Sequence, residues 1–193
     1  LLLPSAPASA AGEVLTMPSV FVAPGAEVVI PVAYAAPNAN PVYSFDLTIT
    51  YDSTRLTLTS ATNAGTATAS WLSAFNTSTP GMVRIGLATG NAPLTASGQI
   101  ALLKFTANPG PQITSPLTFT RHEVDEVVVT KQDGSVRINT PPHAADDPYA
   151  ALEGTQLSVP FASGVLANDT DADAGATRTA VLESGPASGT LVL

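Results

Sequence analysis

The chain has 193 residues, enough for one full domain and part of a second, and its lack of cysteine excludes disulfides, thiolate metal sites and cysteine nucleophiles. The net charge is −8, with six basic and eight acidic residues in 1–139 but one basic and seven acidic residues in 140–193. This excess of negative charge disfavours binding to nucleic acid and anionic membranes and favours binding of a divalent cation. Charged residues make up only 11%, whereas 14 glycines and 17 prolines are present and no apolar run approaches a membrane span, a composition typical of short strands and tight turns.

Residues 1–12 are rich in leucine and small residues. Leu1 to Leu3 precede Ala8-Ser9-Ala10, which has the A-x-A form of a cleavage site. The segment is therefore expected to be either the remnant of a signal peptide or a linker, and its composition leaves both open.

From Val14 onward, the pattern predicts strands. Val28, Ile30, Val32 and Tyr34 share one face of an alternating segment. Pro31 on the other face has no backbone N–H to donate, so this strand is expected at an edge or with a bulge.

The clearest strand is 44–52, in which Phe45, Leu47, Ile49 and Tyr51 alternate with polar residues. Further strands are predicted at 70–76, 82–88, 100–107, 117–120, 124–130 and 135–138. Roughly nine strands separated by turns predict an all-β fold, a two-sheet β-sandwich with a jelly-roll-like topology over 13–139. A proline-rich linker is predicted at 140–148.

Catalytic constellations are missing from the sequence. Asp46 and Asp52 would lie ~20 Å apart along one strand, too far for a glycosidase pair. Glu123 and Asp125 lie in a charged stretch, R-H-E-V-D-E, that more often protects a sheet edge. His122 and His143 are the only imidazoles and lack metal-ligand spacing. The sequence therefore does not predict an enzyme.

Carbohydrate binding is a rival function, because a sugar platform needs several exposed aromatic rings in line. Five aromatic residues have core-facing parity: Tyr34, Tyr43, Phe45, Tyr51 and Phe105. Trp71 remains as a single candidate and is expected to pack in the core.

Five segments in order resemble the cohesin family over about 13–139. They are E-V-V-I-P-V after Pro24-Gly25, S-F-D-L-T-I-T-Y-D at 44–52, S-A-F-N with G-M-V-R-I at 73–85, S-G-Q-I-A-L-L-K-F at 97–105 and D-G-S-V at 133–136. Ser53 stands where the family usually has proline.

The resemblance implies extracellular or cell-surface docking of a dockerin-like module or another secreted protein on one sheet face. The residues expected there are Ser44, Asp46, Thr48, Thr50, Arg84 and Gly86. A sandwich also needs a polar outer face for solubility, so these residues are equally expected as a merely solvated face. Some cohesin-like modules have no known dockerin, so a carbohydrate-binding module and a structural stalk repeat without a ligand remain alternatives.

Residues 140–193 are similar to the start of the cadherin-like or Ig-like tandem repeats of bacterial adhesins. The matching segments are N-T-P-P-H-A-A-D-D-P-Y at 139–149, G-V-L-A-N-D-T-D-A-D at 164–173 and S-G-P-A-S-G-T-L at 184–191. The later strands of such a repeat are missing, so 149–193 is expected to be an incomplete β-repeat, with a strand at 157–160.

No cofactor is expected in the first module, whereas the acidic residues of the second suggest Ca²⁺, which binds carboxylate, carbonyl and amide oxygens. The candidate ligands are Asp146, Asp147, Glu153, Asn168, Asp169, Asp171 and Asp173. An EF-hand is excluded, because Ala180 stands at the twelfth position from Asp169, where a glutamate is needed. A solvated, aspartate-rich turn is the alternative.

Overall fold

The computed structural model describes residues 12–36, 40–109, 113–173, 176–186 and 188–191. The chain divides into two compact units, Leu1–Asn139 and Thr140–Leu193, which are described separately. The predicted signal-peptide remnant or linker lies outside the described residues, except for Gly12.

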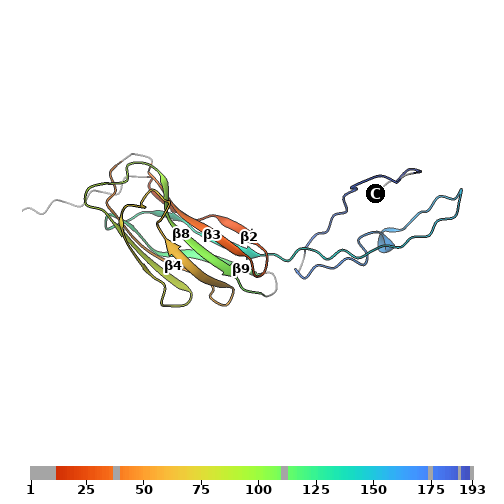
Figure 1. Cartoon of the computed structure of the whole chain (residues 1–193), viewed down its shortest axis with the longest axis horizontal. Helices are drawn as coiled ribbons and strands as arrows, with labels where there is room; N and C mark the ends of the chain where they lie inside the picture. The colour runs from red at the N-terminus through yellow and green to blue at the C-terminus, as the bar shows by residue number, and fades with distance from the viewer. Residues whose placement is uncertain (1–11, 37–39, 110–112, 174–175, 187, 192–193) are drawn as a thin grey trace, which may run out of the picture. The chain divides into compact units, whose positions relative to one another are not determined.

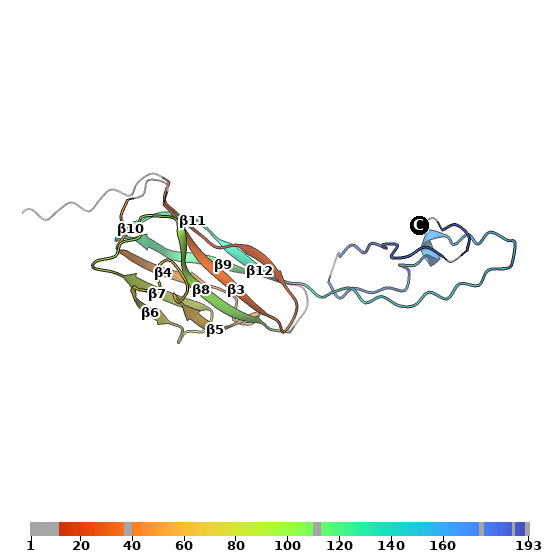
Figure 2. The same cartoon turned by 45° about the horizontal axis from the view of Figure 1, so that its top comes forward.

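The first unit is an all-β sandwich of two sheets (Figures 1 and 2). The five-stranded sheet has the order β11-β1-β3-β8-β5, with β11 Thr130–Gln132, β1 Val14–Thr16, β3 Glu27–Ala35, β8 Gly98–Ala107 and β5 Leu56–Thr62. The seven-stranded sheet has the order β2-β12-β9-β4-β7-β6, with β2 Ser19–Val22, β12 Gly134–Ile138, β9 Ile113–Val124, β4 Ser44–Thr50, β7 Met82–Ala88 and β6 Leu72–Asn76; β10 Val127–Val128 pairs with β9. The predicted two-sheet sandwich is confirmed.

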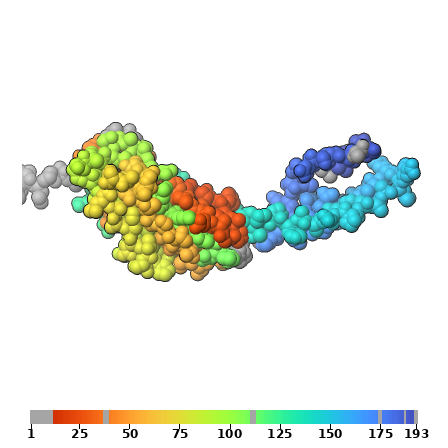
Figure 3. All heavy atoms as spheres, in the orientation of Figure 1, coloured from red at the N-terminus to blue at the C-terminus, as the bar shows by residue number. Residues whose placement is uncertain are grey.

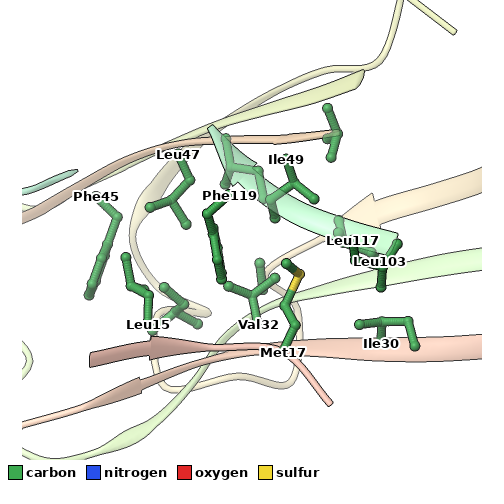
Figure 4. Close-up of a cluster of buried hydrophobic side chains, with 14 of the residues drawn as sticks. Leu15, Met17, Ile30, Val32, Phe45, Leu47, Ile49, Leu103, Leu117 and Phe119 are labelled. Atoms are coloured by element: carbon green, nitrogen blue, oxygen red, sulfur yellow. The ribbon is translucent and has the colours of Figure 1, made fainter. Parts of the chain in front are cut away.

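Alternate side chains of both sheets close one apolar core between the layers. Phe45, Leu47 and Ile49 of β4 are at most 1% exposed. They point toward Leu15, Met17, Ile30 and Val32 from the opposite sheet (Figure 4). Burial of apolar surface contributes about 25 cal/mol per Å², so this core is the main source of stability.

Several strands differ from the predicted ones. The strand predicted at 124–130 is divided between β10 and β11. The largest differences are β5, where no strand was predicted, and β9, which runs over 113–124 and extends well beyond the predicted 117–120. Both contain register shifts, in β5 between Leu58 and Ser60 and in β9 opposite Thr48 and Ile49. A bulge breaks period-2 alternation, which hides a strand from a pattern search.

Pro31 lies where β3 has an open edge. β1 pairs only with Ala33 to Ala35, and the register of β3 with β8 shifts between Val32 and Ala33. No partner strand on the β1 side therefore needs an N–H from Pro31. The expected edge or bulge is confirmed.

The charged stretch 121–126 was expected to protect a sheet edge, but this prediction is wrong, because the end of β9 pairs with β4 on one side and with β10 on the other. It ends in a two-residue turn in which Asp125 and Glu126 have φ of 46° and 67°. Positive φ at both central residues defines the type I′ turn that joins β9 to β10. Short polar residues tolerate this conformation better than branched ones.

Within the described residues of the second unit, no strand is formed, and the segment predicted as a strand at 157–160 is irregular. Its apolar side chains face solvent: Leu152, Phe161 and Val181 are 79%, 95% and 84% exposed. In the space-filling view, the segments of this unit leave an opening between them (Figure 3). A strand without a partner or a covering layer has nothing to bury its face against, which explains the missing strand.

The segment after Asn139 runs antiparallel to 168–173. Its backbone bonds pair His143 with Thr170 in both directions, at 2.8 and 3.0 Å. On either side, carboxylates replace backbone acceptors: Asp173 Oδ2 accepts from Thr140 N–H and Asp169 Oδ1 from Ala145 N–H. Pro141 and Pro142 have no N–H to donate, so a regular ladder cannot form there.

Candidate functional site

β4 and β7 are neighbouring strands within the seven-stranded sheet, with β9 beyond β4 and β6 beyond β7 (Figure 2). The side chains of β4 and β7 that point away from the core form the candidate site. Residues directly opposite on paired strands share a face. The pairs Ser44–Ala88, Asp46–Gly86, Thr48–Arg84 and Thr50–Met82 therefore lie in rows on one surface. This surface, together with the paired outward residues of β6 and β9, is called the front face below.

On the β9 side, the front face carries a charged triad. Arg121 Nε lies 3.0 Å from Asp46 Oδ2, and Arg121 NH2 lies 2.8 Å from Glu123 Oε2. The hydrogen bond to Glu123 and the charge of Asp46 hold the pKa of Arg121 above its ordinary value. Asp46 and Arg121 are exposed and Glu123 is partly exposed, so solvent screens both pairs and they add little to stability. One arginine therefore holds two carboxylates in fixed positions without adding much to the fold.

On the β6 side, the front face is small and apolar. Leu72 pairs with Ala88 and Ala74 with Gly86, and the Leu72 side chain is 81% exposed. Asn76, the last residue of β6, pairs with Arg84 and forms a polar border to this apolar area. A surface that combines an exposed leucine, small residues and a polar border has the composition of a protein interface.

All six residues predicted for a docking surface lie on this face. Asp46 and Arg84 are exposed, and Thr48, Thr50 and Gly86 are partly buried. The Ser44 hydroxyl donates to Asp125 Oδ1 at 3.2 Å, so it serves the fold as well. Their role in binding stays a prediction.

The front-face residues that the sequence did not single out include Leu72, Arg121 and Glu123. Leu72 lies within the predicted strand 70–76, for which no outward face was predicted, and Arg121 and Glu123 belong to the charged stretch that was expected to protect a sheet edge. A charge-alternating R-x-E pair on a strand was the only signal in the sequence for the triad.

The structure brings no acid–base pair together at a site with catalytic geometry among the described residues. Glu123 bonds to Arg121, and Asp125 accepts bonds from the start of β4. His122 Nδ1 lies 2.7 Å from Val129 O within the sheet, and His143 is exposed in the second unit. These groups all have structural contacts.

Aromatic rings are mostly used in the core. Trp71 is 6% exposed, stacks on Phe45 with centroids 5.7 Å apart and donates Nε1–H to Ala92 O, which confirms its packing role. Tyr43 had been expected to face the core but is 44% exposed, because it precedes β4 and the strand alternation does not extend to it. Phe21 is 70% exposed, and the Arg137 guanidinium lies 5.6 Å from its ring centre.

The seven predicted calcium ligands make separate contacts. Asn168 Nδ2 donates to Asp146 O, and Asp171 Oδ1 accepts from Asp173 N–H. In the part of the chain that the structure describes, no three His, Cys, Asp or Glu side chains come together as metal ligands. However, Asp173 is 4% exposed and its Oδ1 is buried without a hydrogen-bond partner. Asp147 and Glu153 do not join Asp173 in a metal-binding cluster among the described residues, and calcium binding stays a prediction.

No helix within the described ranges has the length and apolar character needed to cross a membrane.

Comparison with known proteins identifies the first unit. The family model described as "Cohesin domain" matches residues 14–138. No curated protein matched the chain in a sequence search. The cadherin-like resemblance of residues 140–193 stays a prediction.

Among solved structures, the sixth cohesin of scaffoldin B from Acetivibrio cellulolyticus, in complex with a variant of the Cel5 dockerin, is 22% identical, with a TM-score of 0.56 over 66% of this chain and 99% of that one. A non-cellulosomal cohesin from the archaeon Archaeoglobus fulgidus is 21% identical, with a TM-score of 0.56 over 65% and 90%. A cohesin from Clostridium thermocellum, in complex with a dockerin, is 17% identical, with a TM-score of 0.59 over 67% and 94%. At these identities the likeness establishes the fold.

Proposed function

Because the chain belongs to the cohesin domain family through residues 14–138, we propose that its first unit docks a dockerin-type protein module on the front face. The observation that carries the proposal is the family match together with the composition of this face. The triad of Asp46, Arg121 and Glu123 lies on one side and the exposed Leu72 on the other. Two of the similar cohesins are in complexes with dockerins, which supports this class of partner.

Docking needs complementary shape and charge, and the family is one of non-catalytic docking modules. A rigid sheet with short side chains loses little conformational entropy on binding. The charged triad favours a correctly oriented encounter, and the apolar side excludes water once the partner is bound.

Binding to calcium-loaded dockerins tests the proposal. The full chain is immobilised, and purified dockerins, the Cel5 dockerin of Acetivibrio cellulolyticus among them, are passed over it in biolayer interferometry. We expect at least one to bind, with binding lost in Gly86→Tyr on the front face and kept in Val29→Tyr on the other sheet, where Val29 is 49% exposed. Failure of every dockerin, or equal effects of both tyrosines, would overturn the proposal.

The extracellular setting and a place in a multi-repeat surface protein are part of the same proposal. They are supported by the family and by the resemblance of 139–149 and 164–173 to adhesin repeats. Polysaccharide binding has less support, because the exposed Phe21 ring has the Arg137 guanidinium over one face. Retention of the chain on insoluble cellulose would favour that alternative.

A further inference from the structure

Arg84 differs from the other cationic side chains of the described first unit, because it has no partner. The others have an ion pair, a ring contact or an acidic neighbour: Lys104 with Glu27, Arg121 with Asp46 and Glu123, Lys131 with Asp133, Arg137 with Phe21, and Arg55 with Asp52. Arg84 is exposed near the middle of β7, and its side chain has no hydrogen bond, ion pair or ring contact with any described residue.

The pairing of the triad explains why Arg84 is left over. Asp46 stands opposite Gly86, two residues along β7 from Arg84. However, Asp46 is bound by Arg121 from the other side, at 3.0 Å, and Glu123 binds the same arginine. Both carboxylates of the β4–β9 rows are therefore already bound to Arg121, and among the described side chains of the front face the guanidinium of Arg84 is the charged group without a carboxylate partner.

Gly86 beside it has no structural need to be glycine. Its φ is outside the left-handed region, and an added Cβ would meet only Ala74 Cβ, at 4.0 Å. Glycine inside a strand destabilises the fold relative to alanine, because it loses more conformational freedom on folding. Such a glycine often marks a place where another backbone approaches closely.

We propose that Arg84 binds a carboxylate of the docking partner, whose backbone lies against Gly86. The inference rests on the proposed docking function and names the chemistry of the partner. A guanidinium binds a carboxylate through two parallel hydrogen bonds, which gives direction as well as attraction. The neighbours of Arg84 across the strands, Thr48 and Asn76, are short and neutral, so nothing on the face competes for it.

A selection experiment tests this without a known partner. A calcium-loaded dockerin scaffold is displayed on yeast, with its exposed helix positions randomised over Asp, Glu, Lys, Arg, Ser, Ala and Leu. The library is selected in parallel on the full chain and on Arg84→Glu, and only clones that fail to bind Gly86→Tyr are counted. Melting curves establish that each variant is folded.

We expect clones selected on the natural chain to be enriched in Asp and Glu, and clones selected on Arg84→Glu to be enriched in Lys and Arg. Clones from the natural chain should lose at least tenfold in affinity for Arg84→Gln and stay unchanged for the matched control Lys104→Gln. Clones without acidic enrichment, clones indifferent to Arg84→Gln, or no clone sensitive to Gly86→Tyr would overturn the inference.

The two proposals fail separately. If natural dockerins do not bind but the library shows the charge exchange, the role of Arg84 stands and the dockerin assignment falls. Substitutions of opposite charge at Arg84 and in the dockerin show which dockerin residue contacts Arg84. If a natural dockerin binds but this residue is basic, the carboxylate inference is wrong and the docking proposal stands.

Discussion

Asp125 and Ser44 lie 81 residues apart in the chain and are joined by two hydrogen bonds to one oxygen. Asp125 Oδ1 accepts the backbone N–H of Ser44 at 2.7 Å and its hydroxyl at 3.2 Å. It also accepts the N–H of Tyr43 at 2.9 Å. The turn after β9 thus fixes the start of β4, the strand at the centre of the front face.

Replacing Asp125 should therefore destabilise the first unit. Asp125→Ala leaves the two N–H groups without their acceptor and puts alanine at positive φ, and we expect a loss of about 2–3 kcal/mol in urea unfolding. Asp125→Asn keeps an acceptor and tolerates the same φ, so it should lose about 1 kcal/mol. Equal losses in the two variants would contradict the role of Oδ1.

Two glycines should respond oppositely to alanine. At Gly134, an added Cβ would collide with Pro18 O and come within 2.9 Å of Met17 Cβ, so Gly134→Ala should destabilise strongly, by about 2 kcal/mol or more. At Gly86, the space is open, so Gly86→Ala should be neutral or gain about 0.5 kcal/mol.

Thermal melting of both variants in the same buffer checks this pair. A marked loss at Gly86 would mean that the glycine serves the fold, which would also weaken its assignment to partner approach.

Tyr34 should make the fold sensitive to alkaline pH. Its side chain is 1% exposed, and burial, followed by the nearby Glu13 carboxylate, raises the pKa of the phenol above its ordinary value of 10.0. Although Glu13 is close enough to act on it, no acceptor among the described residues meets hydrogen-bond geometry with Oη. Burial is therefore the main cause of the raised pKa of Tyr34.

A raised folded pKa means that stability is unaffected below about pH 10 and falls above it, where the unfolded chain ionises first. Tyr34→Phe should stay within about 1 kcal/mol of the natural chain at pH 7, because no strong bond is lost. From pH 10 upward, its unfolding free energy should decline less steeply. Parallel pH curves for the two chains would show that Tyr34 ionises equally in both states.

Alternation was enough to predict the core but not the charged triad. In β4 the inward residues Phe45, Leu47 and Ile49 follow from period 2 alone, because the strand has no bulge within its pairing to β7. In β9, continuing the parity of Phe119 would place Arg121 inside. The extra residue Thr120, opposite the shift between Thr48 and Ile49, turns Arg121 outward toward Asp46.

The pairing of strands was also beyond the sequence pattern. Asp46 meets Arg121 only because β9 lies beside β4, and Leu72 joins the front face only because β6 pairs with β7. These neighbours are set by how two layers close one core, which involves contacts across the whole unit. The six predicted front-face residues needed only the parity of two strands, so they could be found.

Calcium should bind the second unit through Asp173 if the prediction for this unit is right. The buried Oδ1 of Asp173 has no hydrogen-bond partner, while Oδ2 accepts from Thr140 N–H. An unsatisfied buried carboxylate oxygen is costly, and a cation would remove that cost. Titration calorimetry of the full chain with calcium chloride should then show binding with Kd on the order of 10⁻⁴–10⁻³ M, as in extracellular modules.

Asp173→Asn should abolish this heat, because the amide removes the charge and one oxygen ligand. Glu183→Gln removes the same charge from an exposed residue outside the predicted set and should leave binding unchanged. Since no three acidic or imidazole side chains meet in the described part of the chain, backbone carbonyls would have to supply most ligands, and magnesium, which needs strict octahedral geometry, should bind more weakly. Equal binding by Asp173→Asn and the natural chain would leave the acidic segment as a turn that holds the linker by hydrogen bonds alone.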